Sequence, residues 1–226
     1  MSVIDLLERP IYGVRQVDRI LGLRPGTALR WIDGYSRRGR EYPPVVRESK
    51  TGDELVTWGE FVEARLLSEY RDQGVPIVRL REVVQRLRDE LGSKYPLATR
   101  RPYVLGRELV AEVQVEVDLE PELQLVVLRT DQYVLTERAS RFFRSVHWDG
   151  VTGEATSFSP RDNSPSVKIN PEISFGEPSV SATRTEVLAE EFRAGTSLLR
   201  LATLFDLPEN QVEDALRYEG ELAATG

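Results

Sequence analysis

The chain has 226 residues, a formal net charge of −7 and 40% hydrophobic residues, which is typical of a folded globular protein with room for two or three small modules. It contains no cysteine, which excludes disulfides, thiolate metal sites and cysteine nucleophiles. The first residues lack the pattern of a signal peptide, and no apolar run is long enough to cross a bilayer, so we expect a cytoplasmic protein with no membrane partner.

The basic residues are concentrated near the N-terminus. Residues 11–50 hold nine Lys/Arg against four acids, a local charge of +5, so the other 186 residues sum to −12. This asymmetry indicates an anion-binding module joined to a part of the chain that avoids anions.

Residues 14–32 predict two short helices joined at a glycine. Val14, Val17 and Ile20 recur at helical spacing, and Gly22 is suited to end the first helix. Pro25 is suited to the first turn of a second helix, whose inward face is Leu29 and Ile32. This is the pattern of a helix-turn-helix unit, although short helical corners also occur in many other folds.

A hairpin is predicted next in the chain. Residues 43–58 read PPVVRESKTGDELVTW, two extended segments around a turn at residues 50–53. Its position suits a wing beside the helices, with Arg47 and Lys50 near backbone phosphate. Arg37, Arg38 and Arg40 fall in a glycine-containing loop before it, and a solvated charge run is the alternative explanation for them.

This order of elements resembles the winged-helix domain of MerR-like regulators. The resemblance rests on Gly13-Val14-Arg15-Gln16-Val17, Gly22-Leu23 and Thr27-Ala28-Leu29-Arg30-Trp31, while Arg24 departs from the Ser or Thr cap that is usual before Pro25. It implies DNA binding through the second helix and the wing. The candidate DNA contacts are Arg15, Gln16, Arg24, Thr27, Arg30, Trp31, Arg37, Arg38, Arg40, Arg47 and Lys50.

Two helices are predicted over residues 57–92. Thr57 and Glu60 form a capping box, and the apolar face that follows ends at Gly74. From Pro76 to Gly92 the apolar residues repeat three and four apart, as in a heptad seam: Ile77, Leu80, Val84, Leu87 and Leu91. We favour packing of this seam within the chain. The alternative is pairing with a second chain, and a homodimer contact is expected either there or in the C-terminal region.

Residues 93–168 change in character. The stretch 108–128 holds six acids and no Lys/Arg, and its alternation around Val113, Val115, Leu125 and Val127 suggests strands. A helix is predicted from Thr136 to Val146, and residues 153–165 read as a turn-rich linker. His147 is the only histidine, and we assign it no role because no second ligand at metal spacing accompanies it.

Residues 169–219 hold five short motifs: Asn170-Pro171-Glu172, Phe175-Gly176-Glu177-Pro178, Thr183-Arg184, Gly195-Thr196 and Gln211-Val212-Glu213-Asp214-Ala215-Leu216. With these motifs the C-terminal region resembles a small helical domain of unknown function that occurs as antitoxin in toxin–antitoxin pairs of the VapBC kind. Ala182 departs from the glycine usual before Thr-Arg. Ser197 is predicted to cap a helix to Phe205, and Pro208 to open another to Tyr218. The exposed acids of this region disfavour DNA and favour a protein partner or dimer contact.

The resemblance implies a cognate toxin with a PIN-like ribonuclease fold, whose acidic residues gather around Mg²⁺ or Mn²⁺, and repression of the pair's own operon. An antitoxin can block such a site sterically or with an arginine. The candidate toxin contacts are therefore Arg184, Arg193, Arg200 and Arg217. For Arg184 we favour a structural role, in which it pairs with Glu186 or caps a turn, over direct insertion into the toxin site.

Together these patterns predict an α+β fold that is mainly helical. The expected domains are 1–92 (winged helix), 93–168 (acidic, β-containing) and 169–226 (helical, antitoxin-type). No phosphate loop, nucleophile elbow or pair of catalytic carboxylates stands out, so we expect no enzyme, no cofactor and no metal site. The alternatives are a stand-alone MerR-like regulator whose C-terminal region dimerises or senses a ligand, and an adaptor that does not bind DNA.

Overall fold

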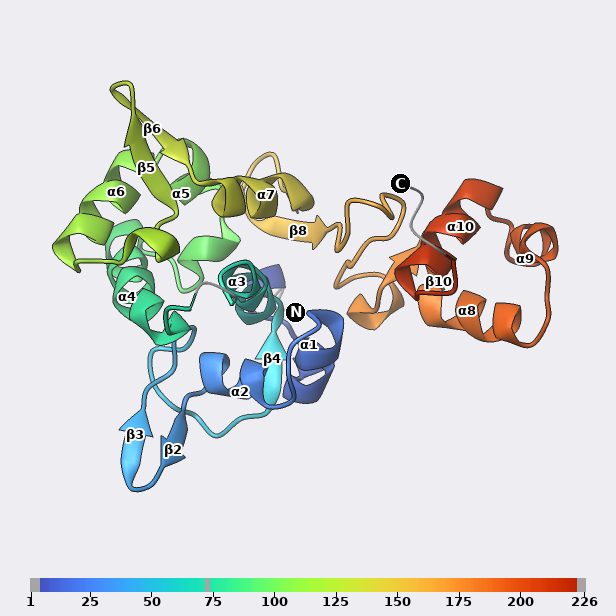
Figure 1. The fold of residues 1–226 in the computed structure, drawn as a ribbon, viewed down its shortest axis with the longest axis horizontal. Helices are drawn as coiled ribbons and strands as arrows, with labels where there is room; N and C mark the ends of the chain where they lie inside the picture. The colour runs from blue at the N-terminus through green and yellow to red at the C-terminus, as the bar shows by residue number, and fades with distance from the viewer. Residues whose placement is uncertain (1–4, 72–73, 223–226) are drawn as a thin grey trace. The chain divides into compact units, whose positions relative to one another are not determined.

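The computed structural model describes residues 5–71 and 74–222, with a mixed α+β fold of helices and short paired strands (Figure 1). It divides into two compact units, and the chain passes between them at β7 (Val146–Trp148) and β8 (Ala155–Phe158). The first unit comprises the chain up to Arg144 together with Trp148–Ala155, and the second comprises Ser145–His147 and the chain from Thr156 onward. Within the described ranges, no helix combines the length and the apolar character needed to cross a membrane.

The first unit begins with the predicted pair of helices, α1 (Val14–Ile20) and α2 (Thr27–Ile32). Helix α2 starts two residues later than expected, because Gly26 has a left-handed φ of 79° and precedes the first helical turn. Its cap comes from α1: the Asp18 carboxylate accepts hydrogen bonds from the backbone N–H groups of Gly26 (2.6 Å) and Ala28 (2.8 Å). A buried anion at this end also complements the helix dipole, so no local Ser or Thr cap is needed.

The predicted hairpin over residues 43–58 is wrong, and the hairpin lies earlier in the chain. Strands β2 (Tyr35–Arg37) and β3 (Arg40–Tyr42) pair antiparallel, while β4 (Leu55–Thr57) pairs with β1 (Pro10–Gly13). Arg38 and Gly39, between β2 and β3, both have positive φ, 52° and 74°, as a two-residue hairpin turn requires. The rings of Tyr35 and Tyr42 stack 4.5 Å apart across the pair. The segment with Arg37, Arg38 and Arg40, expected to be a loop before the hairpin, therefore forms the hairpin itself.

Gly34 fixes the base of this hairpin. Its φ is 73°, and a Cβ at this position would lie 2.5 Å from the carbonyl oxygen of Tyr42 and 2.9 Å from the nitrogen of Pro44. Only glycine satisfies both conditions. The close approach brings the chain after β3 back against the end of α2.

The predicted capping box is confirmed at the start of α3 (Trp58–Ser68), where Thr57 and Glu60 bond reciprocally. This helix ends earlier than the pattern suggested and is followed by α4 (Leu80–Leu91), which η2 (Ile77–Arg79) precedes. The heptad-like seam of α4 is buried in the chain, with Leu80, Val84 and Leu87 at most 2% exposed. Its partners are α6 (Arg107–Glu116) and η3 (Pro96–Ala98), which supports packing within the chain.

Residues 107–116 form helix α6, and the strand predicted there is wrong. The valines that alternate in sequence fall on different sides of this helix, since Val113 is buried and Val115 is 78% exposed. Gln114 is buried because its amide bonds the backbone of the next strand, donating to the Val126 oxygen and accepting from Leu125 N–H, both at 2.8 Å. The strand predicted around Leu125 and Val127 corresponds to β5 (Val126–Arg129), which pairs with β6 (Gln132–Leu135). The predicted helix after Thr136 is α7 (Glu137–Ser145).

No boundary separates residues 1–92 from the region that follows. The Glu63 carboxylate on α3 accepts a hydrogen bond from Leu97 N–H at 3.0 Å, and the Trp58 indole N–H donates to the Ala155 oxygen at 2.7 Å. Short elements complete this unit: η1 (Leu6–Glu8), α5 (Arg101–Val104) and η4 (Pro121–Leu123). The expected middle domain is thus largely part of the first unit, and the second unit begins before residue 169.

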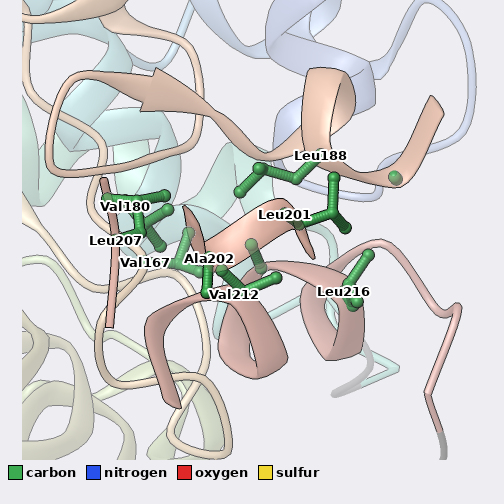
Figure 2. Close-up of a cluster of buried hydrophobic side chains, with 10 residues drawn as sticks. Val167, Val180, Leu188, Leu201, Ala202, Leu207, Val212 and Leu216 are labelled. Carbon is green, nitrogen blue, oxygen red and sulfur yellow. The ribbon is translucent and has the colours of Figure 1, made fainter. Parts of the chain in front are cut away.

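The second unit is a small helical domain with the two predicted helices, α9 (Leu198–Phe205) and α10 (Glu209–Tyr218), and a further helix before them, α8 (Thr185–Arg193). Ser197 caps α9 as expected, since its hydroxyl accepts from the Arg200 N–H. Before these helices lie η5 (Ser174–Gly176), β9 (Ser179–Val180) and β10 (Thr183–Arg184). Figure 2 shows its core, in which Leu188, Leu201 and Val212 meet and are fully buried.

The buried carboxyl of Glu63 predicts how stability depends on pH. Complete burial raises its pKa from 4.5 to about 8, despite the Leu97 hydrogen bond and the charge of Arg88. The folded state thus holds a proton that the unfolded state releases, so the stability that this group contributes is complete below pH 4.5 and disappears as the pH rises toward 8. We expect Glu63→Gln to remove this decline between pH 5 and 8 in urea unfolding. The exposed Glu112→Gln should retain it, and an equal slope in Glu63→Gln would contradict the assignment.

Candidate nucleic-acid interface

The turn between α1 and α2 is held from two sides. Leu23 N–H donates to the Asp18 carbonyl oxygen at 2.8 Å, within the turn. Arg71, beyond the end of α3, donates from Nη1 to the Gly22 oxygen at 3.0 Å. These contacts fix the direction in which α2 leaves α1, and the sequence pattern alone points to neither Asp18 nor Arg71 as a contributor.

Arg47 joins four separate pieces of the first unit. Its guanidinium donates to Glu60 Oε1 at 2.7 Å and to Asp33 Oδ1 at 2.8 Å. It also donates to the carbonyl oxygens of Asp53 (2.8 Å) and Leu55 (2.7 Å). Burial on its own lowers the pKa of Arg47, but Glu60 and Asp33 outweigh it and raise that pKa above its usual value. With its side chain 9% exposed, Arg47 is an internal bridge, and the prediction that it contacts DNA does not fit this geometry.

Asp33 is the other centre of this network. It accepts from the backbone N–H groups of Thr51 (2.7 Å) and Gly52 (2.8 Å) as well as from Arg47. Burial raises the pKa of Asp33, yet the hydrogen bonds from Thr51, Arg47 and Gly52 outweigh burial and leave its pKa below the usual value. The carboxylate therefore stays ionised, and the 43–54 segment folds around it instead of forming a strand pair.

The predicted DNA contacts fall into three groups. Two lie on α1, Arg15 and Gln16. Four lie at the turn and on α2: Arg24, Thr27, Arg30 and Trp31. Apart from the internal Arg47, the others lie on or near the hairpin, which extends beyond α2 (Figure 1). The hairpin group is Arg37, Arg38, Arg40 and Lys50. Lys50 belongs to it because its Nζ donates to Ser36 Oγ at 3.4 Å. Arg40 lies 5.3 Å from the centre of the Tyr42 ring.

A concave surface of about 630 Å³ brings four of these residues together. Arg24, Thr27, Arg30 and Trp31 line it, and the structure adds Tyr35 and Arg71. Arg30 folds back along its own helix, donating from Nε to the Gly26 oxygen at 2.9 Å. The hollow therefore presents arginine and aromatic side chains together with apolar ones, among them those of residues 75–78.

The exposed side chains of residues 11–50 carry a larger net positive charge than all the side chains of this stretch together. Asp18 and Asp33 are buried and bonded to backbone N–H groups, and Arg47 is bonded inside the protein. The remaining eight Lys/Arg of this stretch are exposed, against two exposed acids, Glu41 and Glu48. This surface suits a polyanion.

The four arginines predicted to contact a toxin differ in availability. Arg217 is bonded to Asp214 at 2.8 Å and has a side chain 12% exposed, while Arg193 bonds Glu221 at 2.8 Å on the surface. Arg184 is exposed at the start of α8, where its side chain makes no capping bond. Arg200 is exposed on α9. Arg184 and Arg200 therefore remain the candidates for contact with a partner.

Comparison with known proteins places the chain in a family. The uncharacterised protein Rv2308 of Mycobacterium tuberculosis is 37% identical over 225 residues, which covers 96% of this chain and 93% of that protein. This chain belongs to the family of Rv2308. Residues 167–218 match the family model described as a protein of unknown function, DUF433, which is the region of the C-terminal resemblance.

The crystal structure of Rv2018 from the same organism has the same fold. It matches 94% of this chain and all of that chain with a TM-score of 0.76, at 21% sequence identity. At this identity the match concerns the fold alone.

The contacts of Arg47 predict a structural role that unfolding measurements can test. Arg47→Met leaves Asp33 and Glu60 without their cation, so we expect a decrease of about 3 kcal/mol in the free energy of unfolding. The exposed Arg38→Met should change it by less than about 0.5 kcal/mol. Urea unfolding followed by circular dichroism measures both, and equal stability of Arg47→Met and wild type would contradict the bridging role.

Proposed function

We propose that this protein is a DNA-binding antitoxin of a type II toxin–antitoxin pair. Its first unit carries a MerR-like winged helix-turn-helix that binds operator DNA and represses the pair's own operon. Its second unit binds and neutralises a PIN-like ribonuclease toxin. The observation that carries the DNA-binding part is the exposed basic surface formed by the α1–α2 corner and the β2–β3 hairpin.

The geometry of the first unit supports DNA binding in two ways. A helix held rigidly against its neighbour is what major-groove reading requires, and Asp18 and Arg71 hold α2 and its turn. The hairpin carries arginines at its tip, Arg37, Arg38 and Arg40, where contact with backbone phosphate needs cations without strict geometry. The contacts that we propose are the predicted set without Arg47.

The charge of the second unit supports a protein partner. Helix α10 exposes Glu209 and Asn210 and half-exposes Glu213, and α8 exposes Glu186 and Glu190. These carboxylates would repel phosphate, so this unit is unsuited to DNA despite its helix-turn-helix-like order. Since the α4 seam is buried in the chain, we place the homodimer contact elsewhere, with the second unit as the first region to test.

A stand-alone regulator with a ligand-sensing C-terminal unit is the second candidate. The observation that favours it is a cavity of about 340 Å³ in the second unit, lined mainly by polar residues. Both candidates use the same DNA face. An open reading frame for a PIN-like protein beside this gene favours the antitoxin.

The hairpin arginines give the test of DNA binding. We expect Arg37→Ala/Arg38→Ala to bind the DNA upstream of its own gene less tightly. The slope of the logarithm of the binding constant against the logarithm of salt concentration should fall in magnitude by about one for each phosphate that the variant no longer neutralises. Arg129→Ala/Arg144→Ala removes the same charge from the first unit outside the proposed face and should bind as wild type. Fluorescence anisotropy at several salt concentrations measures the binding of both variants. An unchanged slope in the hairpin variant would exclude Arg37 and Arg38 from the DNA interface.

Toxin binding is tested on the full chain, because residues 1–92 are not a separate unit. We expect Arg184→Ala/Arg200→Ala to capture less of the PIN-like protein encoded beside the gene, with an unchanged thermal midpoint, because both arginines are exposed. The hairpin variant Arg37→Ala/Arg38→Ala should capture as much toxin as wild type. Failure of the hairpin variant to capture toxin would contradict the assignment of the two activities to different units.

A further inference from the structure

The second unit contains a cavity that the proposed antitoxin function does not use and on which the second candidate function rests. It has a volume of about 340 Å³, and its lining residues other than Ile173 are polar by type, although carbon atoms make up most of the lining surface. The polar lining residues are His147, Ser157, Lys168, Asn170, Ser179 and Ser181, all within the same compact unit. Lys168, Asn170, Ser179 and Ser181 also fall inside the segment that matches the DUF433 model.

Lys168 is the charged centre of this cavity. Its Nζ donates to Ser159 Oγ at 2.5 Å and lies 3.0 Å from His147 Nε2. Among the residues that the structure describes, no carboxylate forms an ion pair with it, although the unit is rich in acids. An ammonium group has three N–H donors, and these contacts engage two. A partly buried positive charge without a counter-charge is unfavourable, and an anion would relieve it.

His147 adds a neutral acceptor beside that charge. Burial and the neighbouring Lys168 charge both lower the pKa of His147. Because the ammonium group donates toward Nε2, the neutral ring carries its proton on Nδ1. An anion next to Lys168 would stabilise the imidazolium form, which makes His147 a reporter of binding at this site.

Three residues beside the cavity have a positive φ, a backbone conformation that residues other than glycine rarely adopt. Ser181, in the turn between β9 and β10, has a φ of 51°, and Ser174 and Phe175, next to Ile173, have φ of 50° and 55°. Ser174 Oγ donates to the Ala182 oxygen at 2.9 Å, which links the two turns. Such strain persists only where the surrounding structure holds it, and it is frequent at ligand sites.

We propose that this cavity binds a small molecule through one oxyanion group, a carboxylate or a phosphate. Lys168 supplies the charge, and Asn170 with the hydroxyl groups of Ser157 and Ser179 supplies neutral donors around it. The Ser181 hydroxyl donates to Gln211 Oε1 at 3.2 Å and is not counted among these donors. The volume suits a small metabolite. The site lies in a unit that otherwise repels anions, so a bound oxyanion needs the specific donors of the cavity and is not held by the general charge of the surface.

The single histidine makes the test direct. In untagged full-length protein the His147 ring protons give the only histidine signals in a proton NMR spectrum. We titrate with inorganic phosphate and, separately, with succinate, in a buffer without oxyanions, with sodium chloride at matched ionic strength as control. Binding should shift these signals saturably and raise the His147 pKa by about one unit.

The two anions distinguish the possible ligands. A response to phosphate alone assigns a phosphate ligand, a response to succinate alone assigns a carboxylate, and a response to both supports an oxyanion site open to either group. No response beyond that of chloride overturns the proposal.

Lys168→Met tests the residue that carries the proposal. Without ligand it should raise the His147 pKa, because the neighbouring positive charge is gone, and it should abolish the response to either anion. Lys94→Met removes a lysine from the other unit and should respond as wild type, while Lys168→Arg should keep part of the response. A full response in folded Lys168→Met overturns the proposal. If that variant does not fold, the comparison of oxyanions with chloride in the wild type still decides.

Discussion

The bridge between Arg47, Asp33 and Glu60 is the interaction on which the first unit depends. Asp33 ends α2, Glu60 lies in the first turn of α3, and Arg47 comes from the segment between them. A planar guanidinium can bond two carboxylates and two carbonyl oxygens at once, which an ammonium group cannot do with fixed geometry. The bridge therefore sets where α2 and the hairpin lie relative to α3. A buried pair of this kind adds little net stability over an apolar core, but it specifies one arrangement.

The same bridge explains how an acidic chain acquires a basic surface. Two of the four acids in residues 11–50, Asp18 and Asp33, are directed inward, where each accepts backbone N–H groups that would otherwise be unsatisfied. Arg47 is the one basic residue of that stretch that goes inward with them. Folding thus removes two acids but only one base of this stretch from the surface. The exposed part of residues 11–50 is therefore more positive than their composition alone suggests.

The helices whose signals are local could be predicted from the sequence. Thr57 with Glu60 marks the start of α3, and Ser197 marks the start of α9, because a cap depends on residues three apart. The hairpin could not be placed in this way. Its turn uses Arg38 with Gly39, and the Asn-Gly or Asp-Gly signal is absent, while Val45 and Val46 look like a strand but pack against α2 by bonding the Trp31 oxygen. Helix α6 has no clear apolar face in the sequence. One of its buried positions is the polar Gln114, which is buried because its side chain bonds the backbone of β5. Of the candidate site, the cations could be identified from composition, whereas their separation into exposed contacts and the internal Arg47 depends on long-range partners.

The two proposed anion sites use different basic residues, arginine for DNA and lysine for a small oxyanion. The proposed DNA face uses arginine for nearly all of its cations, since the guanidinium fork suits phosphate oxygens and base edges, and these arginines are exposed. The cavity of the second unit uses Lys168, a compact point charge whose remaining N–H can turn toward a ligand while two contacts hold the amine in place. The chain has 30 basic residues and only three are lysines, so a lysine at the centre of the cavity is not explained by general composition. A guanidinium there would also have to replace the contacts that the compact ammonium group makes with Ser159 Oγ and His147 Nε2, and its fixed planar donors are less easily directed to both.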